Sequence, residues 1–419
     1  MNERRSRPGR GAALPAAFAL LVLAAALRMP VGAEDGAAVP APGAAALDNA
    51  AAVPDNVVPA PEPIVPRFVR ALAGTAPGSN DANPVWSPDG ALVAFERSRG
   101  EGKEIVIARP DGTIVKTVSL KPPDEGGGLP GLFPGDSAEA SFNAGISWSP
   151  SGRRFVFMSN GGEGNYDLYV GGFGAPPALR LTEHREKDGH AHWSPVADNQ
   201  IIFVSGRTGK GDLYLMDLMT RTWARLTSGG RGYLYPRWSP DGRRVAVTAG
   251  ENENHDVYVI DNVAGTRPTM RALTSWRFDD IRPVFSPDGK KIAFYSNYNP
   301  EGNPRIWSIV VVAADGTDPR DGAGLAARVA AADVIPDVET GPAWMPDGAG
   351  IVFVKNDRRE YNPIHVVELA TGIERPLMTE TKMNHDVACA PDGTLAFRAQ
   401  VDQWDHLYVA KVEKRAPYR

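Results

Sequence analysis

The chain has 419 residues, of which 44 are glycine and 37 are proline, and its formal net charge at pH 7 is −5. Such glycine and proline contents favour tight turns over long helices, which argues against an all-α protein. A mildly acidic chain is also poorly suited to a phosphate backbone, so a nucleic-acid partner is not expected. Cys389 is the single cysteine, and no intramolecular disulfide can form.

An export signal is predicted at residues 1–33. Four arginines precede an apolar run at residues 16–27, and the small residues 31–33 follow it. This order of charged, apolar and small segments is typical of a signal peptide. The alternative is a membrane anchor, but the run is shorter than the ~20 residues that span a bilayer. We expect cleavage after Ala33, a periplasmic or secreted protein, and no integral membrane segment after cleavage.

Residues 34–66 are rich in alanine and proline and poor in aromatic side chains. Such a segment buries too little apolar surface to offset its chain entropy, so we predict a disordered linker. The folded domain is expected to span residues 67–419.

A short phrase recurs along this domain and decides its predicted architecture. Its typical form is Trp-Ser-Pro-Asp-Gly, and most of the intervals between copies are 45 to 47 residues. A period of this length with strand-like content is typical of a β-propeller blade. The first residue of each copy, called the anchor here, is Trp86, Trp148, Trp193, Trp238, Phe285, Trp344 or Cys389.

Each unit repeats the same order of β-prone segments. In the unit that begins at Trp193, they lie at residues 201–204, 212–215 and 224–227. Together with the strand that ends at the anchor, they make four short antiparallel strands, which is one blade. Two longer intervals contain insertions of loop composition, at residues 120–145 and 317–341.

These units resemble the WD40-like repeats of TolB-type β-propellers, whose signature is the same turn, a β-run, an I/L-Y-x-x-D segment and then L-T. The resemblance covers residues 67–412 and implies an all-β propeller of four-stranded antiparallel blades. The seven copies of the phrase predict a seven-bladed β-propeller, whereas six blades are usual in TolB itself. Residues 69–72 match residues 270–273, so we expect the N-terminal strand to close the last blade as its outer strand. The resemblance does not by itself specify a function.

The anchor aromatics are predicted to be core residues between neighbouring blades, because large aromatic side chains contribute most when buried. Cys389 takes the same place and is expected to be buried and inert. A Gly-x-Ser-x-Gly motif is absent from the sequence, which argues against a serine-hydrolase domain.

Polar residues before the anchors are the candidate binding site. Five positions upstream, four of the seven units carry a carboxylate, which predicts a negative collar that attracts a cation or a basic peptide. The alternative is that these side chains only satisfy turn amides. The binding candidates from the positions five and three residues upstream are Asp81, Asp188, His190, Asp280, Arg282, Glu339 and Asp386.

A divalent metal is a further hypothesis, with His190, His192 and Asp386 as candidate ligands. Histidine with carboxylate suits a transition metal, and the resemblance extends to propeller lyases that act on acidic sugars through such a site. The alternative is that the histidines are neutral polar side chains that bind no metal. No other cofactor is expected.

The predicted function is that of a non-catalytic protein-binding scaffold in the cell envelope, with an envelope or extracellular protein or peptide as partner. The alternative is a metal-dependent lyase or hydrolase that acts on a saccharide or peptide at the channel rim. A purely structural module is the third class considered.

Overall fold

In the computed structural model, all described residues belong to one compact unit, Pro59–Arg419. The predicted signal peptide and the linker up to residue 60 lie outside the described residues. The described residues are 61–72, 78–100, 102–120, 143–161, 165–173, 178–228, 230–251, 254–298, 306–317, 328–337, 339–357 and 361–412.

Antiparallel β-strands make up nearly all of the regular structure that is described. Three sheets of four strands come first in the chain, together with a short 3-10 helix, η2 (Gly206–Thr208). Their strands are β2 (Ser79–Trp86), β3 (Val93–Arg99), β4 (Gly102–Ala108) and β5 (Ile114–Val118); β6 (Asn143–Trp148), β7 (Arg154–Ser159), β8 (Asp167–Gly172) and β9 (Leu179–Arg180); and β10 (Asp188–Trp193), β11 (Gln200–Ser205), β12 (Asp212–Asp217) and β13 (Thr222–Arg225).

The remaining sheets continue the same order. Their strands are β14 (Tyr233–Trp238), β15 (Arg244–Glu251), β16 (Asn254–Asp261) and β17 (Thr269–Ala272); β18 (Asp280–Phe285), β19 (Lys291–Ser296), β20 (Trp307–Ala313) and β21 (Val329–Ile335); β22 (Ala343–Trp344), β23 (Gly350–Lys355), β24 (Ile364–Glu368) and β25 (Glu374–Pro376); and β26 (Lys382–Cys389), β27 (Thr394–Val401), β28 (Trp404–Lys411) and β1 (Val69–Ala71).

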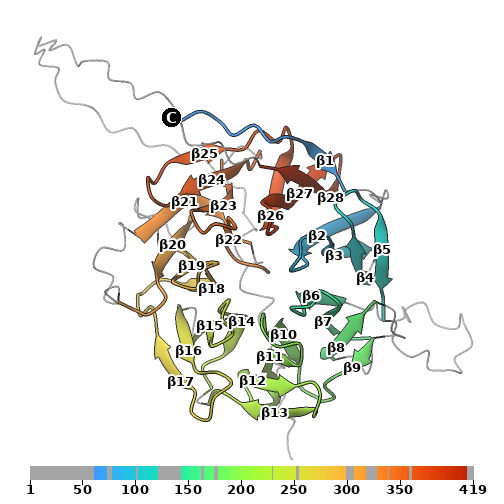
Figure 1. The fold of residues 1–419 in the computed structure, drawn as a ribbon, viewed down its shortest axis with the longest axis vertical. Helices are drawn as coiled ribbons and strands as arrows, with labels where there is room; N and C mark the ends of the chain where they lie inside the picture. The colour runs from blue at the N-terminus through green and yellow to red at the C-terminus, as the bar shows by residue number, and fades with distance from the viewer. Residues whose placement is uncertain are drawn as a thin grey trace, which may run out of the picture. The chain divides into compact units, whose positions relative to one another are not determined.

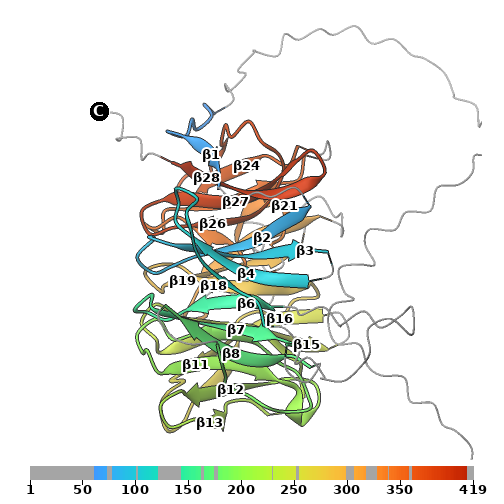
Figure 2. The same cartoon turned by 90° about the vertical axis from the view of Figure 1, so that its right-hand side faces the viewer.

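The sheets of this unit lie around a common centre (Figure 1). The strand that ends at the anchor is the innermost of each sheet, and we call β2, β6, β10, β14, β18, β22 and β26 the inner strands. The view turned by 90° shows β2 to β4 above β6 to β8, so successive sheets pack face to face (Figure 2). Polar groups before each anchor are therefore carried toward the centre.

Two of the expected four-stranded units are joined into one eight-stranded sheet. Strand β21 pairs with β20 and then, through Val334 and Ile335, with β23. Two register shifts in the β20–β21 pairing mark bulges, which bend a strand and redirect its end. The expectation that residues 317–341 form a loop was wrong for this part, because β21 lies within them.

The N-terminal strand β1 pairs antiparallel with β28, with Val69 opposite Ala410 and Ala71 opposite Tyr408. Leu72 follows and is 2 % exposed. Its amide donates to the Leu407 carbonyl at 2.7 Å. The predicted partner of residues 69–72 is thus the one that the structure shows.

The recurrent turn has a local hydrogen-bond explanation. In the first copy, Ser87 Oγ accepts from the Leu92 amide at 2.9 Å and donates to Asp89 Oδ1 at 2.6 Å. Asp89 in turn accepts from the Ala91 amide, and Gly90 has a φ of 70°. Glycine takes this left-handed conformation without a steric penalty, so the Ser-Pro-Asp-Gly order encodes a tight hairpin end.

The L-T element also has a structural role. Thr227 Oγ1 accepts from the Leu213 amide at 3.0 Å and donates to the buried Asp212 carboxylate at 2.9 Å. The same arrangement recurs around Thr182 and Thr274. These threonines therefore satisfy buried polar groups where the outer strand leaves each sheet.

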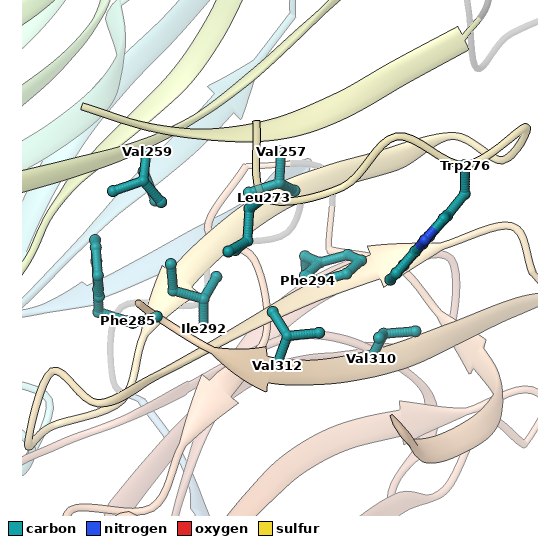
Figure 3. Close-up of a cluster of buried hydrophobic side chains, with 11 residues drawn as sticks. Val257, Val259, Leu273, Trp276, Phe285, Ile292, Phe294, Val310 and Val312 are labelled. Atoms are coloured by element: carbon teal, nitrogen blue, oxygen red, sulfur yellow. The ribbon is translucent and has the colours of Figure 1, made fainter. Parts of the chain in front are cut away.

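The aromatic anchors lie between neighbouring sheets, as predicted. The Trp148 indole nitrogen donates to the Val85 carbonyl of the preceding inner strand at 3.2 Å, and Trp238 and Trp344 make equivalent bonds. Figure 3 shows one such interface, in which buried side chains of the β14–β17 sheet face those of the next. Its labelled residues are Val257, Val259, Leu273, Trp276, Phe285, Ile292, Phe294, Val310 and Val312.

Cys389 lies at the equivalent place and is half-buried. Burial raises the pKa of its thiol to about 12. The thiolate is therefore scarce at neutral pH, which is consistent with the expectation of an inert cysteine.

Candidate functional site

The residue three positions before each anchor is left-handed in all seven units. We call these the bulge positions, because the pairing of β2, β6, β10, β14, β18 and β26 with the following strand shifts register at or beside them. Their φ angles are 55° at Asn83, 67° at Gly145, 49° at His190, 54° at Tyr235, 59° at Arg282, 86° at Gly341 and 48° at Asp386.

Glycine is the residue that takes this conformation most easily, yet five of the seven bulge positions carry a side chain. A left-handed non-glycine residue costs roughly 1–2 kcal/mol. At Gly341 a side chain has no room, since a Cβ there would lie 2.8 Å from the Arg282 carbonyl oxygen. Elsewhere the chain accepts the strain and keeps a different side chain in each unit, which is a pattern found at binding sites.

Three bulge positions form a contact series. The Arg282 guanidinium carbon lies 3.0 Å from the centroid of the Tyr235 ring. The His190 ring meets the same tyrosine edge-on, with 4.4 Å between centroids. On another side, the Asn83 amide donates to Asp386 Oδ2 at 3.5 Å. Neighbouring units thus present their bulge side chains to one another.

The carboxylates expected to form a negative collar have other partners. Asp81 is 1 % exposed and makes two hydrogen bonds with the guanidinium of Arg97, of 2.7 and 2.9 Å. Asp188 is equally buried and pairs with Arg207 at 3.0 Å. Both carboxylates are therefore paired with an arginine of their own unit. They are buried, whereas a collar that attracts a ligand would have to be exposed.

Asp280 occupies the third such position and is fully buried. Burial raises the pKa of its carboxyl well above the usual range. Among the described residues, no ion pair with Asp280 is found. Burial thus favours the neutral form of this carboxyl over the charged form that the collar requires.

Glu339 and Asp386 differ from these three. The Glu339 side chain is 36 % exposed, and its Oε2 lies 3.9 Å from Arg282 Nη1. Desolvation raises the pKa of Glu339 above its ordinary value. Asp386 lies 2.8 Å from Arg398 Nε, while burial and the Asp337 charge raise its pKa.

A small cavity of about 50 Å³ lies among the inner strands. It brings His190 and Glu339 together, whereas Asp81, Asp188 and Asp280 do not line it. Its lining residues are Asn83, Val85, Glu96, Gly145, Ile146, His190, Ala191, Tyr235, Pro236, Arg237, Glu339 and Thr340.

Arg237 is the lining residue that sequence reasoning missed. It precedes the anchor Trp238, and the other units have Val, Ser, His or Ala at this position. A single arginine among the residues that directly precede the anchors was the feature of the sequence that could have identified it. Arg237 Nη2 donates to the Glu339 carbonyl at 2.9 Å and to the Thr340 carbonyl at 3.2 Å.

Burial and the charges of Arg237 and Arg282 lower the pKa values of the basic groups in and beside the cavity. Burial and the neighbouring Arg282 lower the pKa of Arg237 to about 10, so the side chain remains charged at neutral pH. Burial, followed by the charges of Arg282 and Arg237, lowers the pKa of His190 to about 3. Burial and Arg237 lower that of His192 as well. Both imidazoles are therefore neutral at physiological pH.

The candidate metal ligands do not fit a divalent cation. The described residues contain no group of three or more His, Cys, Asp or Glu side chains arranged to hold a metal ion. Asp386 forms an ion pair with Arg398. The Tyr235 ring contacts both His190 and Arg282. Two guanidinium charges next to the histidines would also repel a cation.

Comparison with known proteins points to a family. Residues 232–418 match the model of the TolB β-propeller domain family. A TolB homologue of Chlorobium luteolum is 30 % identical over 162 residues, which cover 38 % of this chain and 35 % of the relative. A TolB homologue of Chlorobium chlorochromatii is 32 % identical over 145 residues, or 35 % of this chain and 31 % of the relative. These matches support a TolB-like β-propeller family for this chain, with residues 232–418 as the part that matches the family model.

The chain spans about a third of the length of these relatives. The similarity therefore concerns the shared region and not the whole of each relative. Among solved structures, an oligogalacturonate lyase in complex with manganese aligns with a TM-score of 0.59 and 14 % identity. The alignment covers 83 % of this TolB-like chain and 93 % of the lyase. At that identity the similarity concerns the fold alone. In the part that is described, no helix is long and apolar enough to cross a membrane.

Proposed function

We propose that this TolB-like protein is a non-catalytic scaffold of the cell envelope that binds a segment of another protein at its bulge positions. Its architecture would be a seven-bladed propeller, closed by β1 as the outer strand of the last blade. The observation that carries the proposal is the left-handed residue repeated in every unit, with a different side chain in five of them. Strain that is kept although glycine would relieve it is expected where the side chain contacts a ligand.

The size and chemistry of the central cavity support binding rather than catalysis. Pockets that enclose a small-molecule substrate have volumes of roughly 300–1,000 Å³, whereas this cavity has about 50 Å³. It can take one functional group of a partner. The polar side chains around it can fix the orientation of that group.

Replacing Asn83 and Tyr235 together by glycine should abolish capture of the partner while the protein stays folded. Glycine adopts the required φ freely, and two units already have it. We expect at least about a tenfold loss of captured partner in a pull-down from native envelope, followed by mass spectrometry. Tyrosine is enriched among the few interface residues whose truncation costs about 2 kcal/mol or more.

The matched control replaces Arg221 and Asp402 by glycine. Both residues are left-handed, with φ of 55° and 57°, but they lie in the hairpins β12–β13 and β27–β28, away from the bulge positions. Equal capture of the same partner by both double variants and the wild type would contradict the proposal.

The alternative is a lyase or hydrolase that acts on a saccharide or peptide, and its support is the fold similarity to the manganese-containing lyase. Metal analysis of the protein purified without added metal separates the two functions. A stoichiometric transition metal together with cleavage of an acidic oligosaccharide would favour the enzyme. The absence of both, with capture of a partner, supports the scaffold.

We also propose export, with a signal peptide at residues 1–33 and a disordered linker at residues 34–66. The support is the order of arginines, apolar run and small residues in the sequence. The intact mass of the protein recovered from the envelope or medium should correspond to a chain that begins at Glu34. A recovered chain that still begins at Met1 would contradict both the signal peptide and the envelope location.

A further inference from the structure

Two guanidinium groups converge on one carbonyl at the edge of the central cavity. Arg237 Nη2 and Arg282 Nη1 donate to the Glu339 carbonyl oxygen at 2.9 and 3.0 Å. Arg282 is 4 % exposed and stacks on Tyr235. Arg237 belongs to β14 and Arg282 to β18, so two neighbouring sheets direct positive charge to the same place.

The arginines elsewhere around the centre have a carboxylate of their own. Arg97 pairs with Asp81, Arg207 with Asp188 and Arg398 with Asp386, at 2.7 to 3.0 Å. For Arg237, by contrast, the described residues provide carbonyl oxygens and no carboxylate within salt-bridge distance. A carbonyl accepts a hydrogen bond but does not neutralise the charge of a guanidinium.

Two other carboxylates near Arg237, those of Glu96 and Asp337, already have partners. Glu96 lines the cavity but is bound to Lys103 at 2.8 Å, and it accepts from the Gly145 amide at 3.0 Å. Asp337 attracts the charge of Arg237, yet its Oδ1 accepts from the Glu339 and Thr340 amides. Both groups are thus already held by other partners.

Glu339 is the group that remains, and it is loosely placed. Its Oε2 is 3.9 Å from Arg282 Nη1, which is longer than a hydrogen bond, and 36 % of its side chain is exposed. A carboxylate of another molecule could lie closer to the two guanidinium groups. Guanidinium forks bind carboxylates with two parallel hydrogen bonds, a geometry that Glu339 does not reach.

We propose that the cavity beside Arg237 and Arg282 binds a carboxylate group of an acidic protein segment, with Glu339 as an intramolecular competitor that holds the place when the partner is absent. The proposal rests on the proposed binding function and adds the chemistry of the recognised group. It replaces the basic segment expected from the sequence with an acidic one, because the collar carboxylates are buried and the arginines of the cavity are not paired by close carboxylates.

Neutral donors complete the site. The imidazole of His190 and the side-chain amide of Asn83 line the same cavity and can each donate a hydrogen bond to an anion. A cavity of about 50 Å³ exceeds the ~10–15 Å³ that one water requires and is far smaller than a pocket for a whole small molecule. It therefore suits a single carboxylate that enters from a side chain or a chain end.

The test titrates the full exported chain with two probes by calorimetry. The first is an acetylated and amidated tripeptide with a central glutamate, and the second has glutamine in its place. E339Q should bind the glutamate peptide at least about tenfold more tightly than the wild type, because the internal competitor is gone. R237Q should bind it at least about tenfold more weakly, although glutamine can still donate to the Glu339 carbonyl.

Two controls make the outcome decisive. R243Q removes an exposed arginine from the turn that joins β14 to β15 and should leave both affinities unchanged. The gain in E339Q should not extend to the glutamine peptide. An E339Q variant without any gain, or with an equal gain for both peptides, would overturn the proposal, and so would tighter binding of sodium galacturonate than of the glutamate peptide.

The result can be separated from that of the proposed function. If the bulge variant loses its protein partner but no variant changes carboxylate binding, the scaffold function stands and the acidic-segment proposal fails. If carboxylate binding follows Arg237 and Glu339 but no partner depends on the bulge positions, the scaffold function fails and the anion site stands alone.

Discussion

A chain that begins at Ala73 should melt well below one that begins at Pro61, or fail to fold at all. The shorter chain lacks β1 and the flanking residues Arg67, Phe68 and Leu72, whose backbones bond to β28. It also lacks Leu72, which packs with Trp86, Phe95 and Leu407 in one buried cluster. Deletion of a buried leucine side chain alone costs about 2–5 kcal/mol, which is a large part of a typical total stability of about 5–15 kcal/mol.

Point substitutions refine this experiment. Leu72→Ala should lower the free energy of unfolding by about 2–5 kcal/mol in urea, whereas Arg70→Ala, at an exposed position of the same strand, should change it by less than about 0.5 kcal/mol. Equal melting of the two truncated chains would mean that the ends of the repeat array are held together elsewhere, and the proposed closure would have to be abandoned.

Arg97→Met should be the most destabilising of the single charge removals around the centre. It leaves the Asp81 carboxylate buried without its two hydrogen bonds, and breaking a buried ion pair from one side costs about 3–5 kcal/mol. The double variant Asp81→Asn with Arg97→Met should recover part of that loss, because no charge is left uncompensated. Urea unfolding at neutral pH measures both.

Asp280→Asn is the informative comparison, because Asp280 occupies the equivalent place. Its pKa is raised in the folded state, so the folded protein binds a proton more tightly than the unfolded chain and loses stability as pH rises above the unfolded value. Asparagine removes this loss, and the variant should be as stable as the wild type at pH 7 or more stable. Asparagine could instead be placed at Asp81, Asp188 or Asp280 with unchanged stability and weaker partner binding in every case. An exposed collar of charges would then be the better description.

Much of the fold could be predicted because its signals are local. The Ser-Pro-Asp-Gly turn is stabilised within a few residues, and β-prone segments alternate along each unit. Most of the intervals between anchors are 45 to 47 residues. The outer strand from residues 69–72 was also found, since its sequence matches that of another unit. The β21–β23 pairing was not, because it depends on how two bulges bend β21.

The candidate site could be placed but not understood from the sequence. The positions five and three residues before the anchor lie in the inner strand in six units, and in the Trp344 unit they precede β22. Comparison of the seven units identifies them as variable and mostly polar. Whether a carboxylate there is free or paired depends on a cross-strand partner: Asp81 faces Arg97, whereas Asp280 faces Ser296. Sequence alone did not connect these residues.

The sequence by itself determined the repeat, the order of strands within a unit, the aromatic contacts between units and the identity of the strand that pairs with β28. Each follows from short-range turn chemistry and from the burial of apolar side chains, which act in the same way in every unit. The tertiary structure alone decided which charged side chains meet at the centre. Arg237 and Arg282 come from neighbouring sheets and meet at the Glu339 carbonyl, and the distances between side chains of different sheets follow from packing.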